Sequence, residues 1–186
     1  MSITTIIALL TIAILYFIYV SLIHKKNKVK EAFSGIDVQL KKRYDLIPNL
    51  LQCAAKFMKH EKSLLEEITK LRTEAMDVSS SESLKKLSSI ENQLSNKLRE
   101  FSVSVENYPD LKSNQTMIQL MDTMNNVEEN IAAARRFYNS AVNDLNNAVE
   151  IFPSSVVAKC LKIEIKELFE IPEDEKKSIN VGDYLK

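Results

Sequence analysis

Apolar residues recur in the second half of the chain at the seven-residue spacing of helices that pack side by side. One series is Met117, Met124, Ile131, Tyr138, Leu145 and Phe152, and its companion series is Leu120, Val127, Ala134, Ala141 and Ala148. This repeat predicts a long helix that begins near Leu111 or Asn114 and contributes one face to a left-handed bundle. Pro153 is expected to end it, with Ser154 or Ser155 capping a short further helix.

The same repeat predicts a second helix over residues 83–107, which stops because Pro109 cannot continue the backbone hydrogen bonding. Its two series are Leu87, Leu94, Phe101 and Tyr108, and Leu84, Glu91, Leu98 and Val105. The serine-rich residues 77–83 before it predict a solvated turn. One glutamate, Glu91, therefore falls on a position that the pattern expects to be buried.

The first helical pattern runs from Val29 to Met76 and contains a proline. Its series are Val29, Ile36, Arg43, Leu50, Phe57, Leu64 and Leu71, and Phe33, Leu40, Ile47, Ala54, Glu61, Ile68 and Ala75. Both series pass Pro48 without losing phase, which favours one long helix kinked near Tyr44. The alternative is a restart, with Asp45 as N-cap and Pro48 in the first turn.

Three charges, Arg43, Glu61 and Glu91, lie on these apolar series and need partners if they are buried. Counting residues back from each expected turn places Arg43 level with Asp110, and Glu91 near Arg135. The same counting places Glu61 near Asn126 and Asn130. Polar residues on such series commonly fix helix register, so we expect a structural role. The alternative is a pocket that uses these charges for binding or chemistry.

The N-terminal residues Ile3 to Ile23 carry no charge and would span about 31 Å as a helix, close to the thickness of a bilayer core. Basic residues follow this run and none precedes it, so we expect an uncleaved anchor with its C-terminal side in the cytoplasm. These flanking residues are expected to touch anionic lipid head groups, and they are Lys25, Lys26, Lys28 and Lys30. The apolar series between Val29 and Ile47 has no evident partner within the chain. The alternatives are burial against another subunit, against the short fourth helix or against lipid, and the first of these suggests self-association.

Composition excludes several function classes. Lys and Arg total 25, as do Asp and Glu, so the chain has no basic excess for nucleic acid. Two glycines cannot build a phosphate-binding loop, and no G-x-S-x-G sequence is present. A di-iron bundle needs two Glu-x-x-His sequences, but Ser21 and Phe57 stand three residues before His24 and His60. We therefore assign no catalytic residue, cofactor or metal ligand.

Several blocks of sequence resemble the LemA family in order and spacing. They are AFSGIDVQLKKRYDLIPNLL, HE at 60–61, ENQL at 91–94, ENYPDLKSN at 106–114 and NIAAARRFYNSAVNDLNNAVEIFPSSVVA at 130–158. The resemblance implies a single-pass bacterial cell-membrane protein with a short outer N-terminus and a helical domain inside. Arg136 and Asn139 share the last block with Arg135 and are counted with it as candidate structural or binding residues. The chain departs from the family after residue 158, where KCLKIEIKELFEI has no glycine, and at Phe33, where the family often has tryptophan.

Together these observations predict an all-α protein, with a transmembrane helix followed by an antiparallel bundle of three long helices and a short C-terminal helical segment. The expected organisation is an anchor over 1–24, a LemA-like bundle over 25–161 and a partly disordered segment over 162–186. The expected function is a non-enzymatic scaffold or adaptor that binds another protein at the cytoplasmic face. An enzyme or ligand-binding module and a self-assembling membrane organiser are the alternatives.

Overall fold

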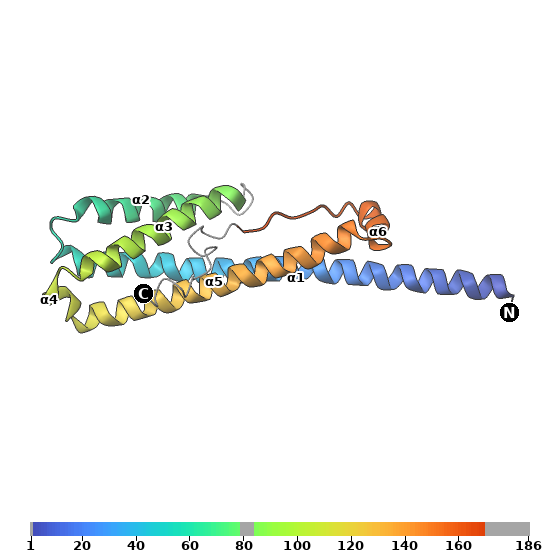
Figure 1. Ribbon diagram of the computed structural model, residues 1–186, viewed down its shortest axis with the longest axis horizontal. Coiled ribbons are helices and arrows are strands. Elements are labelled where there is room, and N and C mark those ends of the chain that lie inside the picture. Colours follow the sequence, from blue (N-terminus) through green and yellow to red (C-terminus); the bar gives the residue numbers. More distant parts are fainter. Residues whose placement is uncertain (1, 79–83, 170–186) are drawn as a thin grey trace, which may run out of the picture. The chain divides into compact units, whose positions relative to one another are not determined.

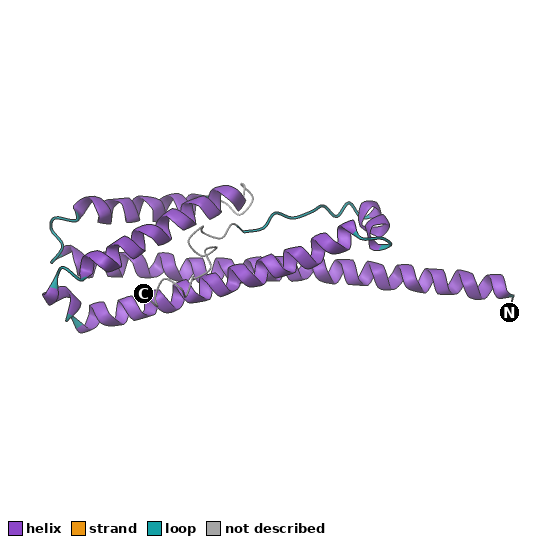
Figure 2. Ribbon diagram, in the orientation of Figure 1, coloured by secondary structure: helices purple, strands orange, loops and turns teal. Residues whose placement is uncertain are grey.

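The computed structural model describes residues 2–78 and 84–169 and is helical through most of them (Figure 1). In chain order the helices are α1 Ile3–Ala55, α2 Lys62–Asp77, α3 Leu84–Val105, α4 Pro109–Lys112, α5 Gln115–Glu150 and α6 Ser154–Cys160. Figure 2 shows only helices and loops in the described part of the chain. The predicted all-α class is confirmed. The predicted disorder near the C-terminus falls mostly on residues 170–186, outside the described residues.

The described residues divide into two compact units, one of residues 2–40 with 130–168 and one of residues 41–78, 84–129 and 169. The helices α1 and α5 each contribute one end to each unit. Because each unit has its own packing, we describe them separately, and we call the second one the 41–129 unit. The expected domain limits at 24 and 161 stay predictions.

In the 41–129 unit, four helical segments run alternately up and down. A hydrogen bond links Arg72 on α2 to Tyr44 on α1, and an ion pair links Glu67 on α2 to Lys97 on α3. These pairings, with the short connections between the helices, make α1, α2 and α3 successive antiparallel neighbours. The start of α5 completes the group, because Glu128 is paired with α1.

The core of this unit consists mostly of residues that the heptad pattern selected, with Met58 and Leu111 in addition. Its buried side chains are Ile47, Leu50, Ala54, Met58, Leu64, Ile68, Leu94, Leu98, Phe101, Val105, Leu111, Met117 and Met124. Eight of the larger side chains, six aliphatic or aromatic ones and two methionines, are at most 1% exposed, and they include residues of α1, α2, α3 and α5. Burial of this kind stabilises by about 25 cal/mol for each Å² of apolar surface removed from water. Most members of the predicted series in this unit are therefore confirmed as buried, whereas Phe57, Leu71, Tyr108 and Leu120 are only half-buried against the core.

The first predicted helix, expected to run to Met76, ends at Ala55 in the structure. α1 continues through Pro48, so the restart with Asp45 as N-cap is wrong, but α1 stops at Ala55 and α2 begins at Lys62. Asp45 instead forms an exposed ion pair with Lys41, one turn earlier. The pattern keeps its phase across the six residues between the two helices, and both helices turn their apolar faces to the same core.

In the other unit, α1 and the second half of α5 pack against each other. Lys28 forms an ion pair with Asp144 at 3.8 Å, and the rings of Phe33 and Tyr138 meet edge to face with centroids 5.8 Å apart. The apolar series of this part of α1 is buried, with Ile36 fully inaccessible. The expectation of an unpartnered series after Val29 is therefore wrong, because this part of α1 packs against α5. The expected first helix, which runs on to Met76, would place the end of α5 too far along the chain to reach it.

Two predicted helix starts, one near Leu111 or Asn114 and one after Pro153, have different outcomes. The Asn114 side-chain oxygen accepts a hydrogen bond from the backbone N–H of Met117 at 3.1 Å, as an N-cap of α5 does. The short helix after Pro153 is confirmed as α6, but no serine caps it, since the Ser154 hydroxyl donates back to the carbonyl of Ile151. The short helix α4, which the sequence did not predict as a separate element, begins with Pro109 in its first turn.

Candidate functional site: a buried arginine cluster

Arg43 lies at the centre of a cluster that joins three helices of the 41–129 unit. The side chain is fully buried on α1. One guanidinium nitrogen, Nη1, donates to Ser95 Oγ on α3 at 2.8 Å and to Glu128 Oε1 on α5 at 2.7 Å. The other, Nη2, is paired with Glu91 Oε2 on α3. A planar guanidinium with several fixed donors suits such a three-way junction better than a lysine would.

The carboxylates around Arg43 differ in their access to water. Glu91 is fully buried, whereas the side chain of Glu128 is 31% exposed. The Tyr44 hydroxyl also donates to Glu91, and the Ser95 hydroxyl is 3.2 Å from the second oxygen of Glu128. A buried charge without a partner is very costly, so each polar group here supports the folding of its neighbours. The cluster therefore has the composition of an internal brace, by which we mean a buried polar network that holds α1, α3 and α5 together.

Arg72 donates a hydrogen bond to a backbone carbonyl that Pro48 leaves without its helical donor. A proline has no N–H, so the carbonyl four residues earlier, that of Tyr44, loses its helical donor. Arg72 Nε on α2 donates to this same carbonyl at 2.7 Å. The helix α1 thus stays continuous through a proline because a neighbouring helix supplies the missing hydrogen bond. This contact also fixes the level of α2 against α1.

The structure corrects one predicted partner of Arg43. Asp110 is exposed in the first turn of α4, and Arg43 is instead held by Glu91 and Glu128. Glu61 is also not a buried seam residue, since it is half-buried at the N-cap position of α2. The level estimates failed because they assumed that the first helix continued to Met76. Glu91 was correctly expected to be buried and paired.

The remaining predicted residues lie in the other unit. Arg135 is buried, with 6% of its surface exposed, whereas Arg136 is exposed and Asn139 is half-buried. Glu91 and Arg135 belong to different units, so the predicted ion pair between them stays a prediction. Of the predicted lipid-contacting lysines, two are exposed and two are half-buried. The exposed ones are Lys26 and Lys30, and the half-buried ones are Lys25 and Lys28.

Sequence reasoning missed three residues of the cluster, which are Ser95, Glu128 and Arg72. Each lies directly beside an apolar series position, namely Leu94, Val127 and Leu71. Such flanking positions often hold the charges that connect neighbouring helices. Their spacing offered that signal, but it does not identify which of many flanking charges reaches a given arginine. Among the described residues, no three His, Cys, Asp or Glu side chains gather as metal ligands would.

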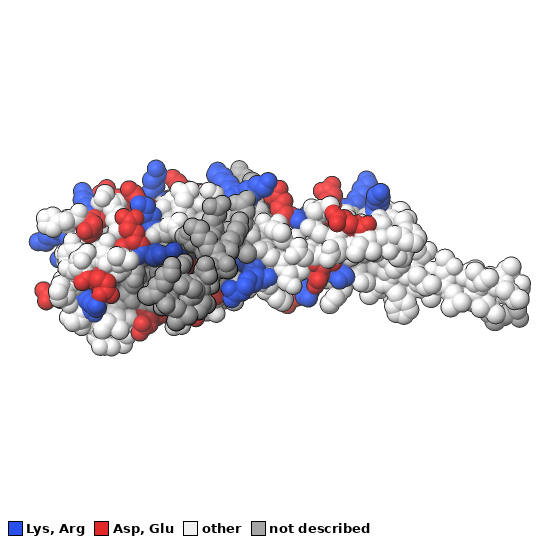
Figure 3. All heavy atoms as spheres, viewed as in Figure 1, with Lys and Arg blue, Asp and Glu red and all other residues white. Residues whose placement is uncertain are grey.

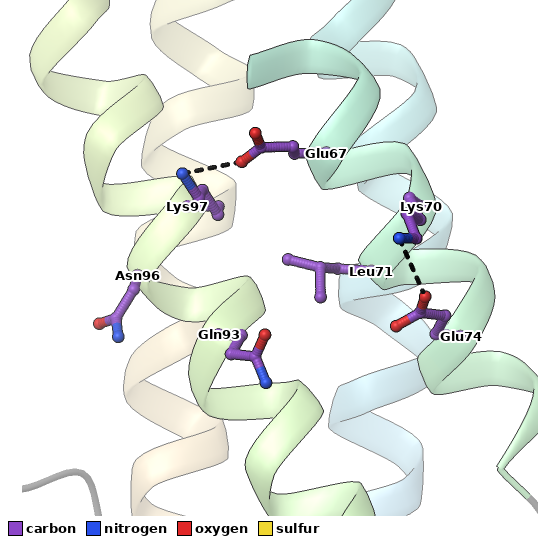
Figure 4. A pocket seen from close by; sticks show the side chains of 7 residues that line it. All are labelled: Glu67, Lys70, Leu71, Glu74, Gln93, Asn96 and Lys97. Atoms are coloured by element: carbon purple, nitrogen blue, oxygen red, sulfur yellow. Dashed lines mark ion pairs between the residues drawn. The ribbon is translucent and has the colours of Figure 1, made fainter. Parts of the chain in front are cut away.

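A surface groove lies between α2 and α3, away from the buried charges of Arg43. Figure 4 shows Leu71 pointing from α2 toward α3, beside ion pairs of Lys97 with Glu67 at 2.8 Å and of Lys70 with Glu74 at 3.8 Å. The lining also includes the amides of Gln93 and Asn96. The pKa of Lys97 is raised above its ordinary value, mainly by its hydrogen bond to Glu67 and, to a smaller extent, by its hydrogen bond to Glu100. The groove is mixed in charge, with an apolar floor.

These features define a class, an all-α protein in which one long helix carries an apolar N-terminal part and continues into a helical bundle. The LemA family matches residues 32–182, so the chain belongs to the LemA family. A curated relative, the protein LemA of Metamycoplasma hominis, is 25% identical over 181 residues. That match covers 94% of this chain and 81% of the relative.

Proposed function

We propose that this protein is a single-span membrane protein whose helical domain acts as a scaffold or adaptor for another protein at the cytoplasmic face. The observation that carries the proposal is the exposure of the apolar part of α1. Residues 2–17 are all exposed, and they include Ile3 at 76% and Phe17 at 71%. Figure 3 shows this part of α1 without a charged side chain on the face in view. A bilayer is the surrounding that would cover such a stretch.

The orientation follows from the charges beside the span. The basic residues all lie after the apolar run, and such residues are enriched on the cytoplasmic side of bacterial spans. The relative from Metamycoplasma hominis supports a bacterial cell membrane as the location. The proposed topology therefore places the first residues outside the cell and everything from Lys25 onward inside.

The adaptor role is supported by the contrast between the two polar regions of the 41–129 unit. The Arg43 cluster is buried and its charges are paired with one another, which favours a structural role over the binding of a substrate. The groove between α2 and α3 is open and presents both charges beside Leu71. An amphipathic helix with charges of both signs along its apolar stripe would match this surface. We place the partner there.

Thiol labelling of intact cells tests the proposed topology. In a chain with Cys53→Ser and Cys160→Ser, a Ser2→Cys variant is expected to react with a membrane-impermeant maleimide added outside. The matched variant retains Cys160, which is exposed, and mutates only Cys53; it is expected to react only after permeabilisation. The reverse pattern would contradict the orientation, and release of the protein by alkaline carbonate would contradict the span.

Photo-crosslinking tests the adaptor role. A photoreactive amino acid at Asn96, in the groove, is expected to give a discrete protein adduct in intact cells. The same group at Asn125, exposed on α5, serves as the matched control. The adduct at Asn96 should also disappear when Leu71→Lys is introduced, provided that circular dichroism shows unchanged helix content. Equal adducts at both positions, or adducts that survive Leu71→Lys, would contradict the proposed docking site.

A further inference from the structure

The corner between α5 and α6 exposes a group of large apolar side chains. Ile151 is 60% exposed, Phe152 is 78% exposed and Val156 is 55% exposed. Phe152 continues the apolar series of α5, yet it lies just beyond the end of that helix and contacts no core. Contiguous exposed apolar residues on a protein surface mark a binding site for protein or lipid.

This corner is level with the end of the apolar run of α1, in the same compact unit. The Lys28–Asp144 ion pair and the Phe33–Tyr138 ring contact show that the two helices are antiparallel in this unit. Ile151 lies seven residues beyond Asp144, about 10 Å along the helix axis. Seven residues back from Lys28 is Ser21, so the corner is level with the last turn of the uncharged run that ends at Ile23.

The burial of α1 side chains agrees with this level. Nearly every residue before Ser21 is exposed, whereas Leu22 is fully buried. In Figure 1, α6 lies at the end of α5 beside the part of α1 that then continues alone toward its N-terminus. The packed part of this unit therefore begins where the proposed membrane span ends.

The corner is held in place by the chain that follows it. After α6, the backbone N–H of Lys166 donates to Asn146 Oδ1 at 2.9 Å, and Asn146 Nδ2 donates to the carbonyl of Lys166 at 2.9 Å. The Tyr138 hydroxyl donates to the carbonyl of Glu167 at 3.1 Å. The segment thus runs back along α5 and closes the corner into a short, fixed protrusion. Its exposed side chains cannot easily turn inward.

We propose that the corner of residues 151–156 is a second membrane contact, which inserts Phe152 and its apolar neighbours into the lipid at the cytoplasmic interface. This inference rests on the proposed anchor and adds to it a fixed depth for the domain. Apolar side chains flanked by basic ones are the composition that binds the interfacial region of a bilayer. Lys159 on α6 and Lys26 on α1 are both exposed and supply the positive charge for anionic head groups.

Tryptophan fluorescence tests the contact in the full chain, which contains no tryptophan of its own. Three single variants are placed in vesicles of phosphatidylcholine and phosphatidylglycerol that contain lipids brominated on their acyl chains. Phe152→Trp reports on the corner and Leu10→Trp on the proposed anchor. Phe137→Trp is the matched control, because Phe137 is an aromatic residue of α5, 51% exposed and about 22 Å before Phe152 along the helix.

We expect brominated lipid to reduce the fluorescence of Phe152→Trp and Leu10→Trp, and to leave Phe137→Trp unchanged but open to quenching by aqueous iodide. If Leu10→Trp is quenched while Phe152→Trp behaves like Phe137→Trp, the corner contact is overturned and the anchor stands. If Leu10→Trp is not quenched, the anchor is overturned, and the corner contact with it. Should Phe152→Trp lose helix content, Val156→Trp on α6 provides the same reading.

Discussion

The hydrogen bond from Arg72 to the Tyr44 carbonyl predicts a measurable energetic link between Arg72 and Pro48. The Nε–O distance of 2.7 Å is that of a strong charge-assisted bond. Loss of a bond from a charged donor costs about 1.5–3 kcal/mol, and both residues are only half-buried, so water can replace part of the bond between Arg72 and the Tyr44 carbonyl. We expect Arg72→Met, which keeps most of the apolar stem, to lower the free energy of unfolding by about 1–2 kcal/mol.

Pro48→Ala should remove most of that cost. An alanine at this position supplies the backbone N–H that proline lacks, so the Tyr44 carbonyl gains its helical donor beside Arg72. The double variant is therefore expected to lose much less stability from Arg72→Met than the chain with Pro48 does. The expected coupling free energy is about 1 kcal/mol, which is well within the range of contacting residues in double-mutant cycles.

Urea unfolding of the full chain in detergent, followed by far-ultraviolet circular dichroism, measures all four members of the cycle. Lys70→Met on the same helix is the matched control, because its exposed ion pair with Glu74 contributes little. That variant should show the same small change with either residue at position 48. If Arg72→Met costs equally much in both backgrounds, Arg72 does not replace the hydrogen bond that Pro48 removes.

Two other variants test local features of the helices. Asn114→Ala should cost about 1 kcal/mol in the same unfolding assay, because it removes the acceptor of the Met117 N–H, whereas Asn114→Asp should retain most of the stability. The pKa of Tyr138 is raised above its ordinary value of about 10, mainly by burial and, to a smaller extent, by the negative charge of the Glu167 carboxylate. The resulting stability is present below that ordinary value and is lost as pH rises through the raised pKa, so Tyr138→Phe should show a shallower alkaline loss of its unfolding midpoint. An unchanged alkaline profile would contradict the assigned cause.

The heptad pattern predicted which residues are buried much better than it predicted where the chain turns. Leu64, Ile68 and Ala75 are buried as expected, although they lie on α2 and not on the first helix. Burial depends on each helix directing one face to the core, and that requirement is the same whichever way the helix runs. The reversal between Ala55 and Lys62 contains no glycine or proline, so the strongest local signals of a turn were absent.

The misplaced turn explains why the partners of Arg43 were missed. With a turn near residue 58, Arg43 is level with about residue 73 on α2, and then with about residue 89 on α3, by the same residue counting. Those levels are close to Arg72 and Glu91, which are the observed neighbours in this cluster. The residue counting itself works, but it was applied to one long helix where the chain has two, α1 and α2. Side-chain reach and rotamer then select Glu91, which no sequence pattern specifies.

Replacing the whole cluster separates its structural role from a chemical one. Arg43→Met alone leaves Glu91 buried without its arginine and should cost about 3–5 kcal/mol, so loss of function in that variant would say little. Well-packed apolar residues often substitute for a buried ion pair at little cost, so Arg43→Met combined with Glu91→Met and Glu128→Leu should recover most of the stability. If the recovered protein still gives the Asn96 crosslink, the cluster is a brace. If it folds but loses the crosslink, the charges themselves are needed, and the interpretation of the cluster as a purely structural brace is wrong.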